Sequence, residues 1–351
     1  MIKRVALVVS VIGVYLWSIF LSFVSIDDLR LTLAPFIAIN VVLLSVDRVT
    51  VNSQVAYLLL LLSSVMLISG VMSIDGLVAC VYLYTFYLLF NRREYVAILL
   101  KSVVAKAILF LVLAPLEIQA MGKQNLSELQ FTGGQYYNIG ALILVLIVGY
   151  GVLNKFWIRT VIVTLYVTIL MSFSRGALLI FPLVILATFR LDRKTVPFLV
   201  ILCCGLYVRI KDTFFLEYWR LRLNLTSSSV EGLFSSSSRH EIIDVYWDNV
   251  DIFHFLFGYG IGGIKSFMTN STKGIMQFGS LHNFVMNSIG EIGLFGFISL
   301  ITVIAFKAFR YGRRELLLIL SFFLFGLTTG LELMNMSRNF SMDIFMLILI
   351  L

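Results

Sequence analysis

The stretch Asn283–Phe306, with the sequence NFVMNSIGEIGLFGFISLITVIAF, decides the fold because Glu291 is its only charged residue. A helix that crosses a lipid bilayer needs about 20 consecutive, mostly apolar residues. Further runs of this kind lie at Val5–Val24, Gln54–Met72, Tyr95–Leu116 and Tyr136–Leu153. The sequence therefore predicts an all-α polytopic membrane protein.

The composition supports a membrane protein. Hydrophobic residues make up 60% of the chain and charged residues 13%, whereas soluble domains have about 45–50% and about 25%. The cysteines, Cys80, Cys203 and Cys204, lie inside apolar runs, which indicates neither a disulfide framework nor a metal site. The net charge of +8 comes from basic residues at the edges of apolar runs, so it indicates membrane topology rather than nucleic-acid binding.

The hydropathy pattern predicts about 12 transmembrane helices. Lys3 and Arg4 precede the first run as in a signal peptide, but no small-residue cleavage site follows, so we expect a retained helix. The expected spans lie near residues 5–24, 31–46, 54–72, 76–90, 95–116, 136–153, 157–172, 177–189, 196–210, 283–306, 316–331 and 341–351, the last being the shortest.

The basic residues predict the orientation of these spans. With the N-terminus inside, the inner loops hold Lys3, Arg4, Arg48, Arg92, Arg93, Lys155, Arg159, Arg190, Arg193, Lys194, Lys307, Arg310, Arg313 and Arg314. The short outer loops hold only Arg30, Lys123, Arg175 and Arg338. Since short cytoplasmic loops carry the excess of Lys and Arg, we predict a cytoplasmic N-terminus.

This orientation divides the chain into three parts. Residues 1–210 form a transmembrane bundle, residues 211–281 a large extracytoplasmic loop, and residues 282–351 the C-terminal transmembrane helices. The segment Asp212–Leu225 mixes aromatic, leucine and arginine residues, which is typical of a helix in the membrane interface. Serine runs at 227–229 and 235–238 indicate either a flexible hinge or a plain linker.

The segment Ser238-Arg239-His240-Glu241 has the serine and glutamate spacing of a capping box, so we expect a helix with Ser238 as N-cap. At about 100° per residue, Arg239 lies on the same side as several apolar residues. This apolar side comprises Ile242, Ile243, Tyr246 and Val250, and the opposite, solvated stripe comprises His240, Asp244, Asp248 and Asp251.

Arg239 at a helix start combines a guanidinium group with unpaired backbone N–H groups, which suits a diphosphate. A salt bridge to Glu217 or Glu231 is the structural alternative. Arg175, within Ser174-Arg175-Gly176, joins two short apolar runs at the outer surface. Its charge either reaches the interface or points into a polar cavity between helices.

His282 stands at the outer end of the predicted span near 283–306, followed by Asn283. Its unperturbed pKa of about 6.5 suits a proton acceptor near neutral pH, although a structural role is also open. Glu291 lies on the helix face opposite His282, so we expect its carboxylate to bond to a neighbouring helix rather than to orient His282. Lys101 and Lys106 lie on opposite sides of another span, where they either snorkel or line a cavity.

The stretch Gly258-Tyr259-Gly260-Ile261-Gly262-Gly263 matches GxGxxG, but no strand precedes it and no βαβ unit surrounds it. We therefore reject a nucleotide site and expect tight turns or a close backbone approach. The chain also shows no HExxH pattern or Cys/His spacing, so we expect no metal and no cofactor.

These pieces, in this order, resemble the O-antigen ligase and polymerase superfamily, which joins lipid-carried glycans outside the cytoplasmic membrane. The resemblance covers roughly residues 170–300 and rests on Ser174-Arg175-Gly176, Arg239, Trp247, the glycine stretch 258–263, His282-Asn283, Glu291, Gly293 and Gly296. It implies a GT-C-like fold, similar to membrane glycosyltransferases with polyprenyl-linked donors.

The resemblance also implies roles for single residues. Arg175 and Arg239 would bind the diphosphate and stabilise its charge, Ser174 and Asn283 would bind substrate, and His282 would act as the base. The expected partners are undecaprenyl-diphosphate-linked glycans, membrane lipid and a chain-length regulator, in a bacterial inner membrane, with O-antigen or capsule as product.

Three functions remain open at this point. A polymerase would extend a lipid-linked repeat unit, and a ligase would place the glycan on lipid A core or another acceptor. A lipid-oligosaccharide flippase should show internal repeats and charges in the middle of several helices. We see no clear repeat, so we favour the enzyme, and among enzymes the polymerase because polymerases of this kind are numerous.

Overall fold

The computed structural model describes residues 5, 9, 60, 93–121, 130–172, 175–188, 237–260, 263–271, 281, 283–308 and 312–329. Within these ranges all regular structure is helical and no strand occurs, which confirms the all-α prediction for this part of the chain. The described residues do not cover, beyond single positions, the predicted spans near 5–24, 31–46, 54–72, 76–90, 196–210 and 341–351, the segment Asp212–Leu225 or the serine runs at 227–229 and 235–236. The total of about 12 spans therefore stays a prediction.

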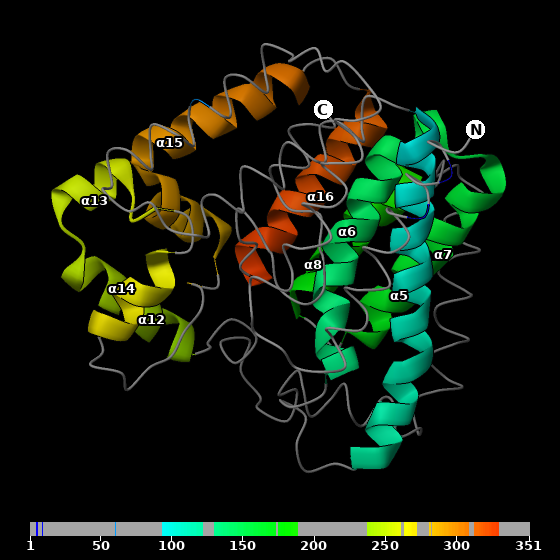
Figure 1. Ribbon diagram of the computed structural model, residues 1–351, viewed down its shortest axis with the longest axis horizontal. Coiled ribbons are helices and arrows are strands. Elements are labelled where there is room, and N and C mark those ends of the chain that lie inside the picture. The colour runs from blue at the N-terminus through cyan, green and yellow to red at the C-terminus, as the bar shows by residue number, and fades with distance from the viewer. Residues whose placement is uncertain are drawn as a thin grey trace.

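A bundle forms one side of the described structure (Figure 1). It contains α5 (Arg93–Met121), α6 (Gln130–Val152), α7 (Lys155–Met171), α8 (Arg175–Thr188) and α16 (Arg313–Thr329). Helix α6 packs against α5, α7 and α16, and α16 also packs along α8. These helices confirm as helical the predicted spans near 95–116, 136–153, 157–172, 177–189 and 316–331.

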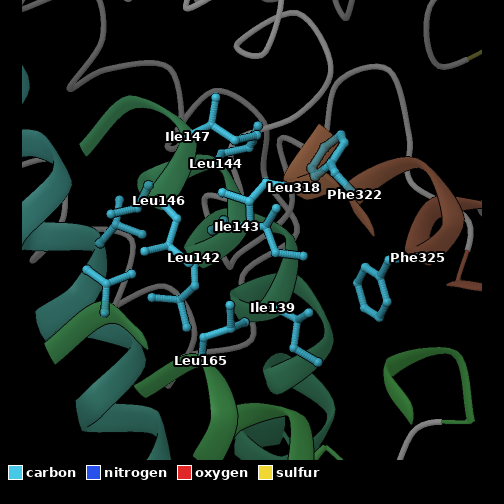
Figure 2. Close-up of a cluster of buried hydrophobic side chains, with 14 of the residues drawn as sticks. Ile139, Leu142, Ile143, Leu144, Leu146, Ile147, Leu165, Leu318, Phe322 and Phe325 are labelled. Carbon is cyan, nitrogen blue, oxygen red and sulfur yellow. The ribbon is translucent and has the colours of Figure 1, made fainter. Parts of the chain in front are cut away.

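The core of the bundle follows from the sequence of α6, which is apolar on all sides from Ile139 to Ile147. Such a helix is stable only when neighbours or lipid surround it. Figure 2 shows α6 side chains between those of neighbouring helices, including Leu165 of α7 and Phe322 of α16. Asn154 separates α6 from α7, because its Oδ1 accepts a 3.0 Å hydrogen bond from Trp157 N–H and so caps α7.

Two described helices are long and apolar enough to cross a membrane, namely α5 over Val96–Leu116 and α15 (Phe284–Ala308) over Phe284–Ala305. Shorter apolar stretches occupy Asn138–Val152 and Leu179–Thr188. The two lysines within the apolar stretch of α5 have different surroundings. Lys101 Nζ lies 5.5 Å from the Trp157 ring centroid, whereas Lys106 Nζ is buried 5.6 Å from that of Phe110.

A second group of helices lies on the opposite side of the molecule, around the first part of α15 (Figure 1). It consists of α12 (Ser237–Asn249), α13 (Ile252–Phe257) and α14 (Gly263–Ser271). Helix α12 packs against α14, and both α13 and α14 pack against α15. The described part of the predicted extracytoplasmic loop is therefore a helical unit docked on α15, which is long and apolar enough to cross a membrane.

Helix α15 is broken at Gly293, whose φ of 72° and ψ of 170° are not helical. The apolar run 283–306 predicted one continuous helix, so this break was not expected from the sequence. The carbonyl groups beside the break bind the loop: Tyr259 N–H donates to Gly290 O (2.7 Å) and Gly260 N–H donates to Glu291 O (3.0 Å). The break thus turns a long apolar helix into a docking site for the glycine stretch.

Candidate functional site

Helix α12 places Arg239 in its first turn, as the sequence predicted, although the helix starts at Ser237. Ser238 therefore lies inside the helix and is not its N-cap, a difference of two residues that is common at helix ends. The apolar side is confirmed: Ile242 and Tyr246 are fully buried. Asp244 and Asp248 are exposed, as expected for the solvated stripe. The described structure does not include the side chains of Arg239 and His240.

One apolar cluster joins the Arg239 helix to the chain around position 282. Its buried members are Ile242, Tyr246, Ile264, Met268, Leu281 and Met286. Ile242 is one helical turn from Arg239, and Leu281 is the immediate neighbour of His282. His282 itself lies outside the described residues, but the segments that carry both predicted site residues pack into the same core.

Two asparagines fix the residues on either side of position 282. Asn283 Oδ1 accepts hydrogen bonds from Val285 N–H (2.9 Å) and Met286 N–H (3.3 Å), so it caps α15. Asn287 Oδ1 accepts a 2.6 Å hydrogen bond from Leu281 N–H, and Asn287 is buried. Asn287 is a positioning residue that the sequence did not reveal, because an asparagine in an apolar run gives no indication of its partner.

Arg175 is the first residue of α8, after the end of α7 at Met171. This agrees with the predicted junction between two short apolar helices. Ser172 caps the C-terminal end of α7, and its N–H donates to Thr168 O at 2.9 Å. Ser174 and the Arg175 side chain fall outside what the structure describes, so the role of this junction in substrate binding stays a prediction.

The glycine stretch brings its backbone close to the backbone of α15. This confirms the close approach that the sequence analysis expected in place of a nucleotide site. Gly258 has a φ of 83°, and a Cβ atom there would lie 2.3 Å from Glu291 O. A Cβ on Gly293 would lie 2.2 Å from Leu256 O. Only glycine at both positions lets the loop backbone reach the break in α15, with the Glu291 side chain buried beside it.

His254 is a second histidine of the loop, and the sequence motifs did not single it out. Asp251 caps α13, since its Oδ1 accepts from His254 N–H at 3.0 Å, and its Oδ2 contacts His254 Nδ1 at 2.5 Å. The hydrogen bond from His254 N–H, and that from the His254 ring, lower the pKa of Asp251. The sequence did contain a signal for this arrangement, because an aspartate three residues before His254 is a common N-cap of a helix.

The His254 ring also supports the glycine stretch. It stacks on Tyr259 with 4.2 Å between centroids, and Tyr259 stacks on Phe267 of α14 at 4.3 Å. Burial raises the pKa of Tyr246 to about 12, and burial together with the Asp251 charge raises the pKa of Tyr259. Both phenols therefore stay neutral near physiological pH, and neither is suited to act as a general base.

No group of three His, Cys, Asp or Glu side chains that could hold a metal ion occurs among the described residues. The groups near the break and the start of α15 include the side-chain amides of Asn283 and Asn287 and the buried carboxylate of Glu291. These groups can bind hydroxyl and phosphate oxygens through N–H donors, and they can orient a neighbouring residue.

In the part of the chain that the structure describes, the fold is helical, and a loop helix that carries an arginine shares an apolar core with the start of a long apolar helix that follows a histidine. Residues 131–301 match the family model described as O-antigen ligase, which supports the O-antigen ligase/polymerase superfamily. No curated protein matches the chain, and no solved structure does. The match covers all of the site motifs named from the sequence.

Proposed function

We propose that this chain is a metal-independent polymerase of a bacterial surface polysaccharide. It transfers a growing glycan from a polyprenyl diphosphate to a lipid-linked repeat unit at the outer face of the cytoplasmic membrane. The observation that carries the proposal is the shared apolar cluster of α12 and the start of α15, together with the family match over residues 131–301. In this proposal residues 211–281 form the extracytoplasmic part of the active site.

The chemistry requires two kinds of group. The departing diphosphate develops negative charge, which Arg239 and Arg175 stabilise as preorganised cations. The acceptor hydroxyl is a poor nucleophile at neutral pH, and His282 removes its proton as the new glycosidic bond forms. Ser174 and Asn283 contact the substrates, and Asn283 does so with its Nδ2 group because its Oδ1 caps α15.

A ligase is the second candidate, because the matching family model carries that description. Both enzymes would use the same donor and the same three residues, Arg175, Arg239 and His282, and they differ only in the acceptor. Cells that lack the protein distinguish them. Loss of a polymerase leaves single repeat units on the acceptor, whereas loss of a ligase leaves long glycans on the polyprenyl carrier and none on the acceptor.

His282→Ala tests the mechanism within either function. General-base assistance contributes about 10²–10⁴-fold to rate, so the variant should accumulate to normal levels, bind donor and transfer almost no glycan. If the chain is a polymerase, cells that carry the variant should accumulate single lipid-linked repeat units, and if it is a ligase, long glycans on the polyprenyl carrier. Mass spectrometry of extracted lipids distinguishes the two. Transfer by the purified wild type should survive EDTA. Full activity of His282→Ala removes the base assignment, and a loss with EDTA that Mg²⁺ restores removes metal independence.

A further inference from the structure

We propose that α13 lies in the outer boundary of the bilayer, with its apolar face covered by lipid acyl chains. The face comprises Ile252, Phe253, Leu256 and Phe257. Ile252 is 79% exposed and Phe253 44% exposed, although both side chains are strongly apolar. An amphipathic helix with such a face is stable when it lies in the membrane interface.

The exposed face continues onto a helix that crosses the membrane. The Phe253 ring contacts the Phe257 ring at 5.1 Å, and the Phe257 ring contacts the Phe295 ring of α15 at 5.7 Å. Phe295 is 55% exposed and Ile298 53% exposed, on the candidate span Phe284–Ala305. Lipid that covers the exposed side of α15 therefore also reaches α13, because one unbroken row of rings joins them.

The backbone around α13 is suited to a medium without water. Irregular backbone at membrane depth is stable only where the protein satisfies its polar groups. Gly258 N–H donates to His254 O (2.7 Å), Tyr259 N–H to Gly290 O and Gly260 N–H to Glu291 O. Gly258 and Gly260 are also buried. The turn after α13 thus exposes no unpaired N–H group at these three positions.

Charge fixes the orientation of α13 relative to lipid. Asp251 and His254 form the polar side, and Asp251 is 56% exposed. A carboxylate is unfavourable among acyl chains, so this pair faces the lipid headgroups while Ile252 and Phe253 reach below them. The inference concerns the bilayer as partner and holds for a polymerase and for a ligase.

Spin labels on the full-length protein test the inference. Single cysteines replace Ile252, Phe253, Ile298 and Asp248 in a background with Cys80, Cys203 and Cys204 changed to alanine, and the proteins are reconstituted in phosphatidylethanolamine/phosphatidylglycerol vesicles. Nitroxides at Ile252→Cys, Phe253→Cys and the span control Ile298→Cys should relax more with oxygen than with the water-soluble complex Ni-EDDA. The label at Asp248→Cys, an exposed position on α12, should show the opposite preference.

Two outcomes overturn the inference. Labels at 252 and 253 that prefer Ni-EDDA, as at 248, would place the face in water. Labels at both positions that neither reagent reaches would show that another protein surface covers the face, such as a second copy of the chain. Because no step of the test measures glycan transfer, its result is independent of the proposed function.

Discussion

Arginine at position 239 illustrates how much one side chain can be predicted. The sequence places it on the apolar side of a helix, and the structure confirms the helix and the burial of Ile242 and Tyr246 on that side. Its helix shares a core with Leu281, next to the proposed base. The sequence left two roles open for Arg239, diphosphate binding and a salt bridge. A substitution that keeps the charge but removes the planar guanidinium group can distinguish them.

Arg239→Lys keeps the charge but removes the planar pair of donors that binds two phosphate oxygens. Loss of one charge-assisted hydrogen bond costs about 1.5–3 kcal/mol, so transfer should fall by about one to two decades. Arg313→Lys, at an exposed position on α16, is the matched control and should keep wild-type activity. Equal activity of Arg239→Lys and wild type at equal expression would make Arg239 a point charge or a structural partner.

Asp251 allows a prediction about pH. Its pKa is lowered in the folded protein, chiefly by His254 N–H, so its stabilising effect is present above the unfolded pKa and is lost as pH falls through the folded pKa. Amide exchange at His254, corrected for intrinsic rates, should therefore accelerate in acid. Asp251→Ala removes the cap and should destabilise α13 by about 1 kcal/mol at neutral pH.

Asp251→Asn is the control for this prediction, because it keeps an acceptor oxygen for His254 N–H but has no charge to lose. Its exchange should be nearly independent of pH across the acid range. The same acid sensitivity in Asp251→Asn and in wild type would mean that another group causes the loosening.

At the scale of elements, the sequence predicted helices well and the interruption of a helix poorly. Runs of apolar residues located α5, α6, α7, α8 and α16, because the bilayer thickness and the 3.6-residue period act locally. The break at Gly293 depends instead on hydrogen bonds from Tyr259 and Gly260, which lie far away in sequence. The hydrogen bond from Leu281 N–H to Asn287 Oδ1 was equally hard to predict, because a buried asparagine in an apolar helix has many conceivable partners.

The glycine stretch 258–263 shows a second limit of prediction from sequence. Its pattern resembled a nucleotide motif, and the absence of a preceding strand and of a surrounding βαβ unit excluded that function. The expected close approach is now explained: Gly258 and Gly293 meet backbone to backbone at the break. A pattern of glycines therefore predicted the proximity, but not the helix that the loop approaches.

Gly258→Ala should separate the loop from α15. The residue has a φ of 83°, and a Cβ would lie 2.3 Å from Glu291 O, so the substitution combines backbone strain with a clash against backbone. Strain of this type costs about 1–3 kcal/mol, and the clash adds to it. Thermal unfolding in detergent and protease cleavage within 252–260 should both detect the loss, together with reduced transfer.

Gly151→Ala is the matched control, because a Cβ at Gly151 meets nothing within 4 Å. Its stability should equal or slightly exceed that of the wild type, as alanine favours helix over glycine. If Gly258→Ala and Gly151→Ala unfold at the same temperature and resist protease equally, the docking of the loop on α15 is not needed for stability.

The whole molecule joins two helical groups through α15, so the proposed chemistry depends on which side of the membrane each end of that helix faces. Proteins of the matching family are membrane proteins, and two described helices are long and apolar enough to cross a membrane. Its orientation rests on the distribution of Lys and Arg in the short loops. The proposed mechanism requires α12, with Arg239, to face away from the cytoplasm.

Two exposed positions allow a direct test of that orientation. Asp248 lies on α12 in the predicted extracytoplasmic loop, and Lys155 begins α7 in a predicted inner loop, and both side chains are exposed. Leu281 is unsuitable as a probe because it is fully buried.

In a background without the native cysteines, Asp248→Cys should react with a membrane-impermeant thiol reagent in cells whose outer barrier is permeabilised. Lys155→Cys should react only after the cytoplasmic membrane is opened. Since exposure is matched, a difference in labelling reports the side of the membrane, and the reverse pattern would invert the topology and end the proposed mechanism.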